Sequence, residues 1–124
     1  MSEVIRNPEG KPFSSWRAAD KFEYVLRDLF PQYYITVEKE LRLDPKRKWR
    51  LDYAWDLPMV AVEIDGVRGR HSTPSGEAKD NEKLNRAIEL GWRVFRYNTA
   101  QLGSKQGVTD AVEQVIRFAC CGRE

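Results

Sequence analysis

The sequence has 124 residues, of which 41% are hydrophobic and 32% are charged, and its formal net charge is +2. This length supports one domain with a real hydrophobic core, and the composition is typical of globular proteins and not of disordered or fibrous chains. No stretch is apolar enough for a membrane span and none resembles a signal peptide, so we expect no membrane contact and a reducing, cytoplasmic location. The small net charge alone does not indicate a nucleic-acid partner.

The chain is predicted to begin with an arm and a helix. Residues 1–13 are polar and contain two prolines and a glycine, which predicts an extended arm ahead of a single domain over residues 14–124. One of two adjacent serines can cap a helix over residues 14–30, and Pro31 ends it. Apolar residues recur on one face of this helix, at Phe22, Val25, Leu26, Leu29 and Phe30.

Three strands are predicted to follow this helix. Residues 33–41 alternate and are rich in aromatic and β-branched side chains, which indicates a first strand. Residues 49–55 and 59–65 form a second and a third strand, and the short turn between them predicts a hairpin. The third strand is almost continuously apolar, as is typical of a central strand that is covered on both faces.

The rest of the chain is predicted to form a helix, a strand and a final helix. The helix covers residues 79–90 and ends at Gly91, and the strand covers residues 92–97. A helix between the third and fourth strands makes these strands parallel neighbours, so the sequence predicts an α/β fold with a mixed sheet between two layers of helices. The final helix begins at Thr109. The residues expected to face the core are Leu84, Ala87 and Ile88 in the first helix and Val112, Val115, Ile116 and Ala119 in the last.

Two carboxylates interrupt the apolar third strand. Val60, Val62 and Ile64 are expected on one face and Glu63 and Asp65 on the other, because strand side chains alternate. Burial of two unpaired charges costs several kcal/mol, which a bound cation would offset. The plainer interpretation is that both carboxylates lie at the wet end of the strand and pair with arginines.

A third carboxylate, Asp52, lies on the predicted second strand. In a hairpin the positions on either side of the turn pair outward from it, which places Asp52 across from Glu63. With Asp65 they would form one cluster of oxygen ligands. Such ligands suit Mg²⁺ or Mn²⁺, which keep water molecules and bind the phosphates of a substrate.

Basic residues flank these carboxylates in the sequence. Arg47 and Lys48 precede the second strand, and Arg68 and Arg70 follow the third. Such clusters can bind phosphate groups, although a short basic run is more often a solvated loop.

The order of these residues resembles the PD-(D/E)XK nuclease superfamily. Within it, the pattern is similar to that of short-patch-repair-type nucleases and of small endonuclease-like proteins of phages and prophages. The resemblance extends from Glu23 to Arg96. The matching motifs are Asp52, then Glu63-Ile64-Asp65-Gly66, and further on Arg70-His71, Gly76, Asp80, Lys83 and Gly91-Trp92-Arg93-Val94-Phe95-Arg96.

The resemblance implies a fold, a reaction and a metal site. The fold is a restriction-endonuclease-like α-β-β-β-α-β core, here with an extra C-terminal helix. The reaction is hydrolysis of DNA phosphodiester bonds with Mg²⁺ or Mn²⁺ and without a nucleotide cofactor. The implied metal ligands are Asp52, Glu63 and the main-chain carbonyl of Ile64, with Asp65 as a further ligand or a water-orienting residue.

Four further residues are candidates for the catalytic site. Asp65 occupies the position where the family has a lysine, so Lys83 or Lys79 on the following helix is expected to supply the positive charge. His71, in the loop after the third strand, is a candidate base or phosphate contact. Glu23 on the first helix is a candidate site residue. For each of them the alternative is an ordinary exposed side chain.

The expected partner is DNA. The predicted contacts are electrostatic and come from Arg47, Lys48, Arg68, Arg70 and Arg96, although Arg96 can equally pair with the acidic cluster. No base-reading helix or zinc finger is evident, which favours selectivity for DNA structure over sequence.

Among similar single-domain nucleases, a Holliday-junction resolvase is the preferred prediction. It would act as a homodimer on branched DNA, in phage recombination within the cytoplasm of a bacterial host. A nicking, repair or restriction-type endonuclease on duplex DNA is an alternative within the same class. A catalytically inactive DNA-binding module and a structural or assembly protein are alternatives from other classes.

Overall fold

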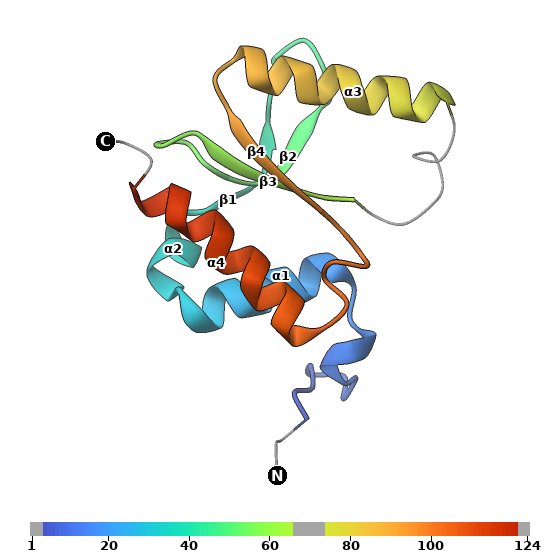
Figure 1. Cartoon of the computed structure of the whole chain (residues 1–124), viewed down its shortest axis with the longest axis vertical. Helices are drawn as coiled ribbons and strands as arrows, with labels where there is room; N and C mark the ends of the chain where they lie inside the picture. Colours follow the sequence, from blue (N-terminus) through green and yellow to red (C-terminus); the bar gives the residue numbers. More distant parts are fainter. Residues whose placement is uncertain (1–3, 66–73, 122–124) are drawn as a thin grey trace.

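A four-stranded mixed sheet lies between two layers of helices in a computed structural model, which describes residues 4–65 and 74–121 (Figure 1). The predicted α/β architecture is therefore confirmed. In these two ranges, no helix combines the length and the apolar character that crossing a membrane requires. The elements are η1 (Phe13–Ser15), α1 (Ala18–Leu29), α2 (Pro31–Thr36), β1 (Glu38–Arg42), β2 (Arg50–Trp55), β3 (Val60–Asp65), α3 (Pro74–Glu89), β4 (Arg93–Asn98) and α4 (Lys105–Cys121).

The strands follow one another across the sheet in the order β1-β2-β3-β4. β1, β2 and β3 are antiparallel neighbours, and β3 and β4 are parallel. Both the hairpin and the parallel pair predicted from the sequence are confirmed. The register places Tyr53 opposite Val62, and Glu63 opposite Arg96 on the neighbouring parallel strand.

Each face of the sheet has its own hydrophobic cluster. α1, α2 and α4 lie on one side of the sheet and α3 on the other (Figure 1). Val60 and Val62 of β3 pack with the larger cluster, whereas Ala61 between them packs with the smaller one, as the alternation predicted. The larger cluster also contains Phe22, Val25 and Leu26 of α1 and Val108, Val112, Val115 and Ile116 of α4.

The predicted first strand is partly wrong, because residues 31–36 are helical. Pro31 does not only end α1 but occupies the first turn of α2, where its fixed φ suits a helix and its missing N–H is no loss. β1 therefore begins only at Glu38. Ile35 of this short helix is 79% exposed, so its β-branched side chain does not belong to a buried strand, although such residues favoured a strand in the prediction.

Several helix boundaries also differ from the prediction. α1 begins at Ala18, after a separate turn of 3₁₀ helix, and its N-cap residue makes no side-chain capping bond, so the serine cap was wrong. α3 and α4 both begin earlier than predicted, at Pro74 and Lys105. Gly91, with φ of +100°, follows the end of α3 as expected. Two residues predicted to be inward are largely exposed, Leu29 at 44% and Ile88 at 58%.

The N-terminal segment is folded back and is not an extended arm. The backbone N–H of Phe13 donates to the carbonyl of Ile5, and Arg6 pairs with Pro12 in an isolated bridge. The side-chain oxygen of Asn7 accepts hydrogen bonds from backbone N–H groups within the loop that results. Phe13 itself is buried in the larger cluster, which attaches this loop to the domain.

Candidate active site

Asp52 and Glu63 face each other where the hairpin of β2 and β3 opens. The regular pairing of the two strands extends to Tyr53 and Val62, one residue before these carboxylates. The backbone N–H of Asp52 donates to Oε2 of Glu63 at 3.1 Å, and the backbone N–H of Ile64 donates to Oδ2 of Asp52 at 2.7 Å. Each side chain thus takes a main-chain donor of the opposite strand. The prediction that Asp52 lies close to Glu63 is confirmed.

The surroundings of these two carboxylates oppose their ionisation. Burial raises the pKa of Asp52, and the nearby charges of Glu40 and Asp65 raise it further. The hydrogen bond from the Ile64 N–H and the charge of Lys83 lower this pKa but do not outweigh the burial. Burial also raises the pKa of Glu63, and the charge of Asp52 adds to that effect. Burial and nearby carboxylate charges thus oppose ionisation of both groups, and a bound cation would offset this.

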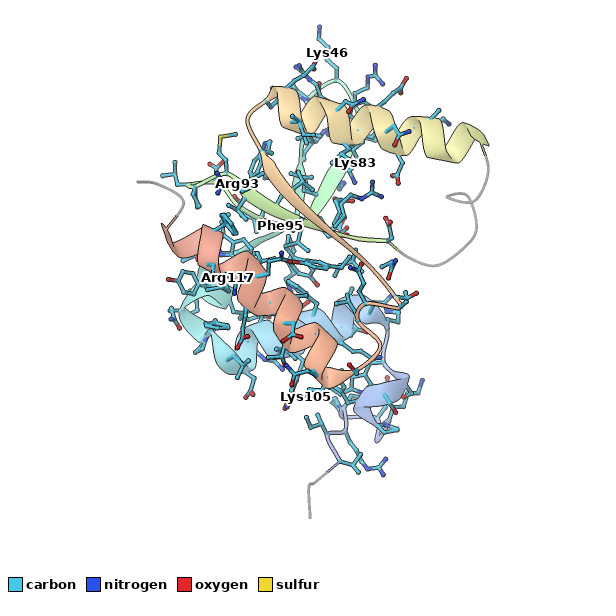
Figure 2. The ribbon with its side chains drawn as sticks, viewed as in Figure 1. Lys46, Lys83, Arg93, Phe95, Lys105 and Arg117 are labelled. Carbon is cyan, nitrogen blue, oxygen red and sulfur yellow. The ribbon has the colours of Figure 1, made fainter. Side chains whose placement is uncertain are left out.

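Lys83, which lies on α3, partly compensates the negative charge of Asp52 and Glu63. Its Nζ donates to Oε1 of Glu63 at 2.8 Å, and the side chains of the lysine and the glutamate are only 18% and 15% exposed. Figure 2 shows Lys83 between α3 and the sheet, pointing toward the strands. Lys79, one turn earlier, lines the same cleft but is exposed. Of the two lysines considered from the sequence, Lys83 is the one that contacts the carboxylate pair.

Asp65 does not join Asp52 and Glu63 in a single cluster but pairs with Arg96. Nη2 of Arg96 lies 2.8 Å from Oδ1 of Asp65 and 2.9 Å from Oδ2 of Asp80 on α3. Of the two interpretations of Arg96, the structure shows the ion pair with carboxylates. Across the described ranges, no three His, Cys, Asp or Glu side chains are grouped so as to hold a metal ion. The metal-ligand role of Asp65 stays a prediction.

Glu23 is held close to this site by three hydrogen bonds. It accepts from the hydroxyls of Tyr53 and Tyr34 at 3.2 and 3.0 Å and from Nζ of Lys39 at 2.8 Å. Burial opposes the ionisation of Glu23, but the bonds from Lys39 and Tyr34 outweigh it and lower its pKa. Glu23 and Asp52 line one cavity of about 290 Å³, so this glutamate is a neighbour of the site and not a remote surface residue.

The carboxylates lie in a cleft of about 490 Å³ between the sheet and α3. Its rim includes the exposed basic residues Lys48, Arg50 and Lys79. Of the predicted DNA contacts, Lys48 therefore faces the cleft, whereas the guanidinium of Arg47 lies 4.6 Å from the centre of the Trp49 ring. Asp52, Glu63, Ile64, Asp65, Asp80 and Lys83 form the inner lining.

Two acidic residues of the cleft were not assigned to the site from the sequence. Glu40 on β1 has a φ of +58°, which is unusual for a non-glycine residue, and nothing in the sequence indicates it. Asp80 is part of the motif that resembles the nuclease superfamily, and its spacing of three residues from Lys83 places both on one face of α3. That spacing could have identified it.

Three predicted site residues cannot be placed. His71, Arg68 and Arg70 lie outside the described residues, so their roles stay predictions.

Comparisons of the chain with family models, with curated proteins and with solved structures give no match.

Proposed function

We propose that the protein is a metal-dependent endonuclease that hydrolyses phosphodiester bonds of DNA. The observation that supports this most directly is the pair of half-buried carboxylates, Asp52 and Glu63, in a cleft whose rim is basic. Such a centre suits a divalent cation inside and phosphate groups around it. The resemblance of the motif order to PD-(D/E)XK nucleases points to the same reaction.

The donor set of the cleft fits a hard divalent cation. In the part of the chain that the structure describes, Lys83 pairs with Glu63, and Arg96 pairs with Asp65 and Asp80, while Asp52 accepts the Ile64 N–H. The cleft thus brings several carboxylate oxygens together. Asp52, Glu63 and the carbonyl of Ile64 would hold Mg²⁺ or Mn²⁺. When bound, such an ion lowers the pKa of water to generate the nucleophile and stabilises charge on the leaving oxygen.

The residues of the chain itself would bind and orient the substrate. Lys48, Arg50 and Lys79 on the rim would bind phosphates on either side of the cleaved bond, as point charges or guanidinium forks. Lys83 would hold Glu63 in place and present a proton-donating ammonium group to the centre. Arg96 would keep α3 against the sheet through Asp80, which fixes the position of Lys83.

Branched DNA is the proposed substrate, and a homodimer is the proposed working form. Charged side chains predominate in the lining of the cleft, and the sequence contains no evident base-reading helix or zinc finger, which favours selectivity for DNA structure over base sequence. A two-fold dimer would present two such clefts to a two-fold junction, which is the geometry that a Holliday-junction resolvase needs.

A cleavage assay tests the proposal. Labelled four-way junctions, linear duplex and single strands would be incubated with Mg²⁺ or Mn²⁺ and with EDTA, for the wild type, Asp52→Ala and the exposed control Asp56→Ala. We expect paired, metal-dependent nicks in the junction that Asp52→Ala reduces by at least about a hundredfold and Asp56→Ala leaves unchanged. Cleavage of plain duplex would indicate a nicking or repair enzyme, and binding without any cleavage would indicate a DNA-binding module.

A further inference from the structure

Three adjoining cavities form one groove that leads from the acidic cleft to the N-terminal loop. The cleft and the middle cavity share Asp52 and Ile64 in their linings, and the middle and distal cavities share Arg17 and Glu23. The distal cavity has a volume of about 450 Å³ and lies between the N-terminal loop and α1. Figure 1 agrees with this path, because the N-terminal end of α1 and the C-terminal end of β3 lie on the same side of the molecule.

The distal cavity combines basic and aromatic side chains. Arg6, Lys11, Arg17 and Arg27 line it and are exposed. Three carboxylates, those of Glu9, Asp20 and Glu23, line it as well, and Arg17 pairs with Asp20. Trp16 and Tyr24 also line it and are half-buried, with their ring centres 5.4 Å apart at an angle of 82°.

The loop that forms one wall of this cavity is held in place by specific bonds. Nε1 of Trp16 donates to the carbonyl of Lys11 at 2.9 Å, and the side-chain oxygen of Asn7 accepts from the backbone N–H of Lys11 at the same distance. The guanidinium of Arg6 donates to the carbonyl of Gly10 at 2.8 Å. These bonds position the Arg6 guanidinium, the backbone of Lys11 and the indole ring before any ligand arrives, which lowers the entropic cost of binding.

Charge varies along the groove in a regular way. Basic residues lie at the distal end and, beyond the carboxylates, at the opposite end with Lys48, Arg50 and Lys79. Acidic residues lie between these two ends: Asp20, Glu23, Glu40 and Asp52 line the middle cavity, where Arg17 and Lys39 pair with Asp20 and Glu23. A polyanionic chain that crosses this acidic middle would meet basic side chains on both sides of it.

We propose that the groove binds a single DNA strand, which runs from the acidic centre to the N-terminal loop and stacks an unpaired base against Trp16. Basic side chains for the backbone combined with aromatic rings for the bases are the usual features of single-strand binding, and a paired base has no face available for the indole. The inference depends on the proposed function only for the position of the cleaved bond. Among branched DNA substrates, it favours those with a single-stranded arm next to the duplex over a fully paired four-way junction.

Binding without metal tests this inference separately from cleavage. Anisotropy would be measured in EDTA for labelled blunt duplex and for the same duplex with a single-stranded arm of about ten nucleotides, placed at the 5′ or the 3′ end. The variants are Trp16→Ala and, because loss of the indole could unfold the loop, Arg27→Glu. The matched control is Lys105→Glu, an exposed charge reversal at the start of α4 that lines none of the three cavities (Figure 2).

We expect the wild type to bind one of the armed duplexes roughly tenfold more tightly than the blunt duplex. Trp16→Ala should remove most of this difference, Arg27→Glu should weaken armed-DNA binding roughly fivefold, and Lys105→Glu should change neither. Equal binding of blunt and armed duplexes, or armed-DNA binding unchanged in both groove variants, would overturn the inference. Arm-dependent binding without cleavage under either metal would support the single-strand groove and contradict the nuclease activity. Cleavage without any preference for an armed duplex would support the nuclease activity and contradict the groove.

Discussion

Asp52 connects the chemistry of the cleft to the stability of the fold. Its carboxylate accepts the Ile64 N–H, and burial together with Glu40 and Asp65 raises its pKa. A carboxyl group that ionises more readily in the unfolded chain makes folding less favourable as the pH rises. The loss of stability begins near the ordinary pKa of about 4 and is complete above the raised pKa of the folded state.

At the residue scale, we predict that Asp52→Asn raises the melting temperature at pH 7 in EDTA by about 2–5 °C. The asparagine oxygen can still accept the Ile64 N–H, so the substitution removes the charge and keeps the hydrogen bond. The gain should shrink as the pH falls toward 4, because the wild-type Asp52 takes up a proton over this range. Circular-dichroism melts between pH 4 and 8 measure this, with the exposed Asp56→Asn as control. A lower melting temperature at pH 7, or a difference independent of pH, contradicts the prediction.

At the scale of the elements, the local sequence pattern predicted contacts correctly where the elements in contact follow one another in the chain. The alternation of residues 49–65 predicted the hairpin and hence the contact between Asp52 and Glu63. The same reasoning failed at Pro31, because a proline suits the first turn of a helix as well as the position after one. It left two alternatives open for Asp65, a metal ligand or a partner of an arginine, since the register of β4 that brings Arg96 to it is set by packing and not by local sequence.

The first turn of α4 contains a glycine for which the sequence offers no reason. A Cβ atom at Gly107 would overlap the backbone carbonyl oxygen of Gln101. That carbonyl cannot move away easily, because Gln101 and Asn98 exchange two hydrogen bonds of 2.9 Å between side chains and backbone N–H groups. The loop between β4 and α4 therefore packs directly against the helix that follows it.

We accordingly predict that Gly107→Ala destabilises the protein by about 1–3 kcal/mol, through overlap with a fixed backbone. Helix propensity alone predicts the opposite sign, a gain of about 1 kcal/mol. Urea unfolding curves decide between the two. Glu113→Ala, at an exposed position of the same helix, is the matched control and should stay within about 0.5 kcal/mol of the wild type. Stabilisation by Gly107→Ala would mean that the loop shifts without cost.

At the scale of the whole molecule, the two faces of the sheet are unequally packed. α1 and α4 bury many large side chains against the sheet and against each other, whereas Ala87 is the one buried residue of the smaller cluster that comes from the described side chains of α3. Polar contacts supply much of the remaining attachment of α3, namely Lys83 to Glu63, Asp80 to Arg96 and Arg86 to Asp44. The helix that presents Lys83 is thus the less firmly packed layer.

We predict that native-state hydrogen exchange separates these layers. Amides in the middle of α3 should exchange at least about tenfold faster than those in the middle of α1 and α4, because α3 can open without exposing the larger cluster. Mass spectrometry of peptides that cover each helix measures this. Arg96→Gln, which removes the contact to Asp80, should speed exchange in α3 and leave α4 unchanged. Equal protection of all three helices would show that the molecule opens only as one unit.

The contact between Lys83 and Glu63 has a consequence for how the cleft would respond to ions. The ammonium group of Lys83 occupies Oε1 of Glu63 and, being part of the same fold, competes with any dissolved cation for that oxygen. A divalent ion that bound Glu63 through this oxygen would therefore have to displace the ammonium group. The apparent affinity of such an ion measures the balance of that exchange, so a neutral side chain at position 83 would make ion uptake easier even where it makes the reaction slower.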